Sequence, residues 1–149
     1  CRIYPLEELG CGLMRARRRM LMSSDSVKYI FQSGIAKING TVAREHGVSV
    51  RSDNILIDRT GYLSIKTDFS RFSKLYITIS LWNDTDYGAK YGYGNEADTF
   101  TRYETKYTGT LETKVFDISA VTGEKYINFV NSGYMNSKSI YISGIWLEM

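Results

Sequence analysis

Apolar and polar side chains alternate strictly along residues 74–83, KLYITISLWN. This alternation places successive side chains on opposite faces of a β-strand, and the β-branched and aromatic residues found here favour strands. The pattern therefore predicts a central strand with one face in a hydrophobic core. The residues expected on the core face are Leu75, Ile77, Ile79 and Leu81.

Shorter segments with a similar pattern lie on both sides of this strand, separated by Gly, Asn, Asp and Ser. Asn39 and Gly40 form a dipeptide that favours two-residue hairpin turns, so we expect a hairpin over residues 34–45. Residues 59–61 are expected to form a turn between two strands. The other predicted strands cover residues 27–32, 47–51, 54–58, 62–67, 102–107, 111–118 and 125–131.

The last predicted strand, SIYISGIWLE at residues 139–148, changes register at Gly144. Its four aliphatic residues form two pairs of opposite parity, one before and one after this glycine. A β-bulge at Gly144 would keep both pairs in the core. The pairs are Ile140 with Ile142 and Ile145 with Leu147.

No helical pattern alternates with the predicted strands, of which there are roughly eight to ten. We therefore predict an all-β fold, an antiparallel jelly-roll β-sandwich over residues 27–149. Residues 1–26 differ in character and are predicted to form an N-terminal arm and linker. Good helix formers fill residues 13–22, LMRARRRMLM, and predict a short helix there.

The arm also carries the charge of the chain. The formal net charge is +3, and all of this excess lies in residues 1–22, because basic and acidic residues are equal in number beyond them. A neutral sandwich is not expected to bind nucleic acid. We interpret the arginines of the arm as a docking site for an acidic partner, with a solvated helix face as the alternative. They are Arg15, Arg17, Arg18 and Arg19.

Catalytic and cofactor chemistry find little support in the sequence. His46 is the only histidine and lies in no nucleophile motif. Two cysteines and one histidine are too few for a four-ligand zinc site, and no glycine-rich phosphate loop precedes a helix. We expect no enzyme activity and no cofactor. A pair of glycosidase carboxylates stays open, because such residues lie far apart in a chain.

No apolar run reaches the roughly 18 residues of a transmembrane helix, so no membrane span is expected. Cys1 and Cys11 lie in the arm, where they could form one disulfide, while the sandwich contains no cysteine. This usage fits a protein made in a reducing cytosol. The start at Cys1 leaves three origins open: loss of an initiator Met, a fragment of a longer chain, or a lipid-modified cysteine.

The segment 83–101 lacks periodicity and is long for a connection, which favours a functional loop. Sugars stack their C–H faces on aromatic rings while polar groups bind their hydroxyls, and this segment offers both kinds of side chain. The alternatives are tyrosines that pack on the sandwich or on another subunit, and calcium binding by residues 83–86, NDTD. The predicted carbohydrate-binding residues are Trp82, Asp84, Asp86, Tyr87, Tyr91 and Tyr93.

Two stretches resemble known families and together cover about a third of the chain. Residues 9–24, LGCGLMRARRRMLMSS, resemble the LGLRRRLMM segment that precedes terminal β-domains in minor structural and tail proteins of phages and prophages of Firmicutes, although Cys11 departs from it. The ending, FDISAVTGEKYINFVNSG followed by SIYISGIWLE, resembles the last strands of jelly rolls like those of carbohydrate-binding modules.

This resemblance implies a non-enzymatic virion tail protein, made in the bacterial cytoplasm. Its arm would join other particle proteins, its sandwich would serve adhesion or assembly and could bind carbohydrate, and the subunit would form a homo-oligomer. The alternative is a free-standing, extracellular carbohydrate-binding module that recognises a cell-surface glycan through residues 83–101.

Overall fold

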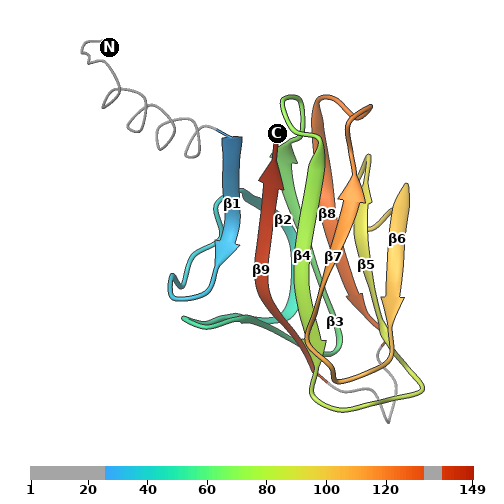
Figure 1. Ribbon diagram of the computed structural model, residues 1–149. Coiled ribbons are helices and arrows are strands. Elements are labelled where there is room, and N and C mark those ends of the chain that lie inside the picture. The colour runs from blue at the N-terminus through green and yellow to red at the C-terminus, as the bar shows by residue number, and fades with distance from the viewer. Residues whose placement is uncertain (1–25, 133–138) are drawn as a thin grey trace.

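The computed structural model describes residues 26–132 and 139–149, in which nine strands form an antiparallel β-sandwich (Figure 1). The all-β prediction is confirmed. The arm with Cys1, Cys11 and Arg15, Arg17, Arg18 and Arg19 lies outside the described residues, so its helix and its docking role stay predictions. The strands are β1 (Val27–Gln32), β2 (Thr41–Val50), β3 (Ile55–Asp68), β4 (Lys74–Leu81), β5 (Ala89–Gly94), β6 (Arg102–Lys106), β7 (Glu112–Asp117), β8 (Glu124–Asn131) and β9 (Ile140–Glu148).

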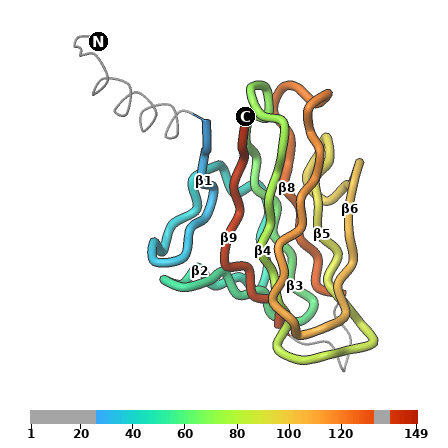
Figure 2. The backbone as a smooth tube through the Cα atoms, in the orientation of Figure 1, coloured from blue at the N-terminus to red at the C-terminus, as the bar shows by residue number. Residues whose placement is uncertain are grey.

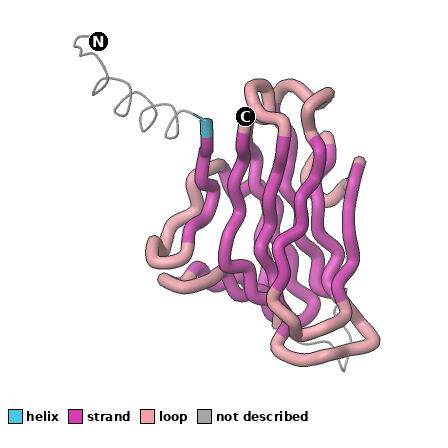
Figure 3. Tube along the Cα trace, viewed as in Figure 1, coloured by secondary structure: helices cyan, strands magenta, loops and turns pink. Residues whose placement is uncertain are grey.

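The strands form two layers that are joined by backbone hydrogen bonds at one side only. One layer has the order β6-β5-β8-β3, with β2 beside β3, and the other has the order β7-β4-β9-β1. The long β3 joins them, because its first residues pair with β9 and residues 62–68 pair with β8. Both layers can be followed in Figure 2, and Figure 3 shows that the loops lie mainly at the two ends of the strands.

The core lies between these layers and follows the period-2 pattern. All four aliphatic residues predicted on the inner face of β4 are buried. Thr78 of β4 pairs with Gly144 of β9, but the next residue, Ile79, pairs with Ile142. Ser143 is therefore the extra residue of a bulge in β9. The predicted bulge is therefore confirmed, and all four aliphatic residues of β9 are fully buried.

Three predictions about the strands are wrong. The hairpin over residues 34–45 does not form, because Asn39 bonds to β1 through its backbone N–H to Ile30 O (2.7 Å) and its side-chain amide to Tyr29 O (3.2 Å). Residues 59–61 are not a turn: β3 bends there without ending, with Thr60 at a φ of 65°. The segment 83–101 is not one loop, because it contains β5.

The open side of the sandwich, where β6 and β7 are the outermost strands of their layers, is closed by two ion pairs. The Lys106 ammonium lies 3.0 Å from a Glu112 carboxylate oxygen, and its side chain is only 1% exposed. Lys114 and Glu104 form the second pair, at 3.6 Å. β6 and β7 are not paired through their backbones, so these side-chain contacts join the two layers at this side.

Candidate functional site

The outward face of the layer formed by β2, β3, β8, β5 and β6 is covered by the chain itself. The loop between β5 and β6 lies over β8, where the Asn128 side-chain amide donates to Glu96 O (3.1 Å) and Thr99 O (2.6 Å). Asp98 of this loop pairs with Arg44 of β2 at 2.9 Å. Asn128 is fully buried as a result, so we call this the covered face.

The aromatic rings of the covered face already have partners within the molecule. The guanidinium carbon of Arg44 lies 4.0 Å from the centre of the Tyr62 ring, and the His46 ring stacks on the same tyrosine at 5.5 Å. The Lys90 ammonium lies 4.2 Å from the centre of the Tyr103 ring. These contacts join the rings to cationic side chains of the same layer.

The opposite layer carries a row of aromatic side chains on its outward face. Tyr29 of β1 is in register with Trp146 of β9, which is in register with Tyr76 of β4. The Trp146 and Tyr76 rings are stacked at 4.8 Å and are parallel to within 3°, and the Tyr29 and Trp146 ring centres are 6.1 Å apart. We call Tyr29, Trp146 and Tyr76 the aromatic row.

A second group of aromatic side chains lies further along the same strands. Tyr141 of β9 and Trp82, just after β4, have ring centres 6.5 Å apart. Trp82 is 66% exposed, which makes it the most exposed large hydrophobic side chain in the described residues. Between this pair and the aromatic row, Thr78 and Thr113 bring their hydroxyl oxygens to 2.8 Å. We call this outward surface of β7, β4, β9 and β1 the open face.

Local contacts hold the aromatic row in place. The Tyr76 hydroxyl donates to a carboxylate oxygen of Glu148 at 2.9 Å, and this bond raises the pKa of Tyr76 above its ordinary value. A Cβ at Gly144 would lie 3.1 Å from Cζ3 of Trp146, so the indole leans over the bulge of β9. A side chain at this position would therefore crowd the Trp146 ring.

No protein-family model and no curated protein matches this chain. Among solved structures, a family 29 carbohydrate-binding module in complex with mannohexaose is similar, with a TM-score of 0.58, 16% identity, and coverage of 82% of this chain and 90% of that one. A second family 29 module, from Piromyces equi, has a TM-score of 0.54 and 14% identity, with coverage of 82% of this chain and 89% of that one. A family 4 module has a TM-score of 0.50 and 16% identity, with coverage of 82% of this chain and 85% of that one. The chain shares the fold of carbohydrate-binding modules.

These modules are non-catalytic and are jelly-roll sandwiches, and the identities are low enough that the likeness concerns the fold alone. The resemblance of the C-terminal strands to carbohydrate-binding modules is therefore supported at the level of fold. Nothing in the comparisons supports a phage origin. Within residues 26–132 and 139–149, no helix is long and apolar enough to cross a membrane.

The predicted carbohydrate-binding residues fall into three places in this module-like fold. Trp82 lies on the open face, beside Tyr141. Asp84, Asp86 and Tyr87 are exposed in the loop after β4, where Asp84 Oδ1 accepts a bond from the Gly109 N–H at 2.9 Å. In the described part of the chain, no three Asp, Glu, His or Cys side chains gather closely enough to hold a metal ion.

Tyr91 and Tyr93 lie in the core rather than in a ligand-binding loop. They belong to β5, where they face inward and contact the Phe116 ring edge-on at 6.2 and 6.3 Å. The exposed fractions are 0% and 3%, so neither ring offers a face to a ligand in this fold. Sequence reasoning did not select Tyr29, Tyr76 or Trp146 as site residues. Alternation with core residues places Tyr76 outward in β4, but β1 is irregular at Tyr29, since Ile30 and Phe31 are both buried.

Proposed function

We propose that this protein binds carbohydrate, without catalysis, on the open face. The observation that carries the proposal is the aromatic row, which crosses three strands in register on a surface that no described segment of the chain covers. Its spacing follows the strands, about 4.8 Å apart, so the rings form a continuous ridge. The covered face supports this role less well, because its centre is filled by the loop between β5 and β6.

The chemistry of the open face suits a sugar chain. Aromatic rings offer apolar surface to the C–H groups of sugar rings, and contiguous exposed apolar groups on a soluble protein usually mark a binding site. Hydroxyl groups of the sugar require hydrogen-bonding partners beside those rings. Thr78, Thr113 and Glu148 supply such groups next to the aromatic row.

The fold adds independent support. Jelly-roll modules with this fold include one solved in complex with mannohexaose, which is an oligosaccharide. The likeness does not transfer a sugar or any binding residue to this chain, because the identity is only 16%. It makes carbohydrate a sensible class of ligand, and the side chains of the open face give the reason to place the ligand there.

A virion-tail role is the finer hypothesis, and it rests on residues 9–24 alone. These residues lie outside the described part of the chain, so particle partners, the homo-oligomer, the virion location and docking by the four arginines stay predictions. The comparisons favour the alternative, a carbohydrate-binding module. A module of this kind would serve adhesion on a particle or free in the extracellular medium.

Replacing Trp146 by Ala is expected to weaken glycan binding tenfold or more, because tryptophan at the centre of a contact surface typically dominates its energetics. The measurement is a glycan array with the full chain, followed by calorimetric titration of the strongest neutral hit. Trp82→Ala should also weaken binding, and its high exposure means that the fold should tolerate it. Tyr103→Ala is the matched control, because that exposed ring lies on the other layer.

Two results would contradict the proposal. One is an array without a hit for the wild-type chain on a broad set of neutral and acidic glycans. The other is a hit whose affinity falls with Tyr103→Ala but not with Trp146→Ala or Trp82→Ala. Thermal unfolding of each variant separates loss of binding from loss of structure, and Trp146→Phe should restore part of the affinity since it keeps a ring in the row.

A further inference from the structure

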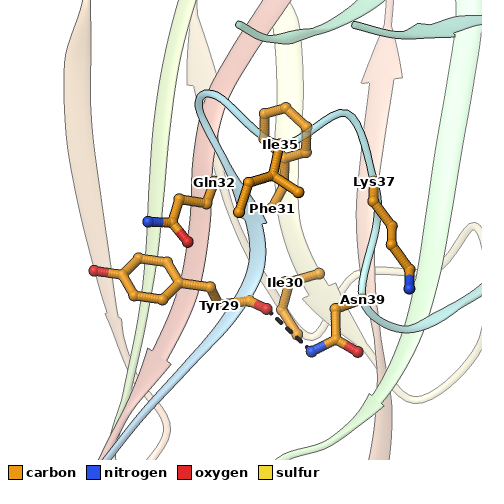
Figure 4. A pocket seen from close by; sticks show the side chains of 7 residues that line it. All are labelled: Tyr29, Ile30, Phe31, Gln32, Ile35, Lys37 and Asn39. Carbon is orange, nitrogen blue, oxygen red and sulfur yellow. Dashed lines mark hydrogen bonds between the residues drawn. The ribbon is translucent and has the colours of Figure 1, made fainter. Parts of the chain in front are cut away.

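A hollow of about 210 Å³ opens beside β1, between this edge strand and the loop that follows it (Figure 4). Its lining combines apolar side chains with two amides and one ammonium group. Pockets for drug-sized ligands have about 300–1,000 Å³, so this hollow has the size for one sugar unit or a substituent of one. The lining residues are Tyr29, Ile30, Phe31, Gln32, Ile35, Lys37 and Asn39.

The loop that forms the far wall of the hollow is fixed by backbone hydrogen bonds. Ile35 N–H donates to Gln32 O (3.1 Å), Lys37 N–H to Ile35 O (2.7 Å) and Asn39 N–H to Ile30 O (2.7 Å). At its tip, Gly34 has a φ of 101° and donates to Ser52 O at 2.6 Å. The hollow is therefore preformed, which lowers the entropic cost of binding a ligand there.

The charged side chains of the segment that forms the hollow are all basic. Residues 26–44 contain no Asp or Glu. Lys28 directs its ammonium to Thr67 Oγ1 at 3.1 Å, away from the hollow's lining. Lys37, which does line the hollow, has no ion-pair partner within residues 26–132 and 139–149. The hollow thus offers a cation, with the side-chain amide of Asn39 on the same side of β1, to an anionic group.

The hollow continues the open face, because Tyr29 belongs to both. Its backbone oxygen accepts the bond from the Asn39 amide in the wall of the hollow, and its ring lies 6.1 Å from Trp146 in the aromatic row. Figure 4 shows Lys37 and Asn39 on the loop side of β1, with Tyr29 and Gln32 on its other side. A glycan that stacks on the aromatic row could therefore extend past Tyr29 into the hollow.

We infer that the hollow is a subsite for a carboxylate-bearing sugar, such as a uronic acid unit, at the β1 end of the glycan site. The inference rests on the proposed function and narrows its ligand to acidic glycans. The Lys37 ammonium supplies the charge, and the second N–H of the Asn39 amide, whose first donates to Tyr29 O, is a further donor for a carboxylate oxygen. Ile35, which is 53% exposed, supplies apolar surface for the sugar ring that carries it.

The test compares the full chain with Lys37→Gln on an array of neutral, carboxylate-bearing and phosphate-bearing glycans, with methyl-esterified partners for the carboxylate-bearing ones. Lys37→Gln should weaken binding to the carboxylate-bearing hits about three- to tenfold, and should leave neutral hits unchanged. Added salt should reduce the wild-type preference for the acid over its ester. Lys125→Gln, which removes the same charge beside Asn95 on the other layer, should change neither.

Each other outcome overturns the inference in a recognisable way. One outcome is that neutral or esterified glycans bind as tightly as the acids, and that their affinity falls with Trp146→Ala but not with Lys37→Gln. This outcome would refute the subsite and leave the proposed function standing. A preference for phosphate over carboxylate would refute the choice of carboxylate. A change in self-association of Lys37→Gln by sedimentation, with glycan affinity unchanged, would assign the hollow to a contact between copies of the chain. An array without hits refutes the proposed function itself.

Discussion

Replacing Glu112 by Gln is expected to lower the free energy of unfolding by about 3 kcal/mol and Tm by roughly 6–12 °C. The side chain of Lys106 is 1% exposed, and its ammonium has two partners, Glu112 Oε2 at 3.0 Å and Thr108 Oγ1 at 3.2 Å. The variant leaves a buried cation with neutral partners only. Breaking a buried pair costs about 3–5 kcal/mol, and we expect the lower end because Glu112 is itself 47% exposed.

Lys106→Met provides the first control, since it removes the buried charge and keeps an apolar side chain of similar length. This variant should be less destabilising than Glu112→Gln, and adding Glu112→Gln to it should cost little more. Glu124→Gln is the second control, because Glu124 pairs with the exposed Lys66 and such pairs contribute about 0–1 kcal/mol. Equal melting temperatures for Glu112→Gln and Glu124→Gln would show that the buried pair does not hold β6 to β7.

Gly92→Val is expected to cost more than about 4 kcal/mol, a loss large enough to unfold the sandwich. Gly92 lies on the outward side of β5, and a Cβ there would collide with the backbone oxygen of Arg102 in β6. A backbone atom cannot move aside without disturbing the pairing of β5 with β6. The measurement is urea unfolding of the full chain, followed by far-ultraviolet circular dichroism.

Lys90→Val is the matched control for this variant. Lys90 lies two residues earlier on the same side of β5, where its ammonium contacts the rings of Phe100 and Tyr103. Its replacement removes these contacts, at a cost of about 0.5–1 kcal/mol, and creates no backbone collision. If Gly92→Val is as stable as Lys90→Val, then β6 does not approach β5 as closely as in this structure.

The sequence predicted the strands whose alternation is regular. Residues 74–83 were recognisable because one face is aliphatic and the other is not, and β4 forms there. The bulge in β9 was recognisable from the change of parity at Gly144, because a core excludes half of the possible registers. These features follow from local patterns, which a single sequence contains.

Other features depend on contacts that the sequence does not show. The strand β5 reads AKYGYG, in which glycines replace the polar side chains that usually mark an outward face. Asn39-Gly40 favours a hairpin turn, but the amide of Asn39 bonds to β1 and the following residues pair with β3. Such tertiary contacts override turn propensity, and only the assembled sheet reveals them.

The candidate site was predicted in part. Trp82 was chosen for its place beside a tyrosine-rich segment and lies on the open face, whereas Tyr91 and Tyr93 of the same segment are buried. The aromatic row combines residues from three strands, and its register depends on pairings between positions as far apart as Tyr29 and Trp146. Carbohydrate binding by Trp82, Asp84, Asp86 and Tyr87 stays a prediction.

A nuclear magnetic resonance titration of the full chain with its strongest array hit distinguishes binding on the open face from binding on the covered face. The chain has two tryptophans, Trp82 and Trp146, and both lie on the open face. If the glycan binds on the open face, both indole N–H signals should shift with added glycan, while the backbone amide signals of Ser64 and Asn128 in the other layer should stay in place. Shifts confined to Ser64, Asn128 and their neighbours, with both indole signals unmoved, would contradict binding on the open face.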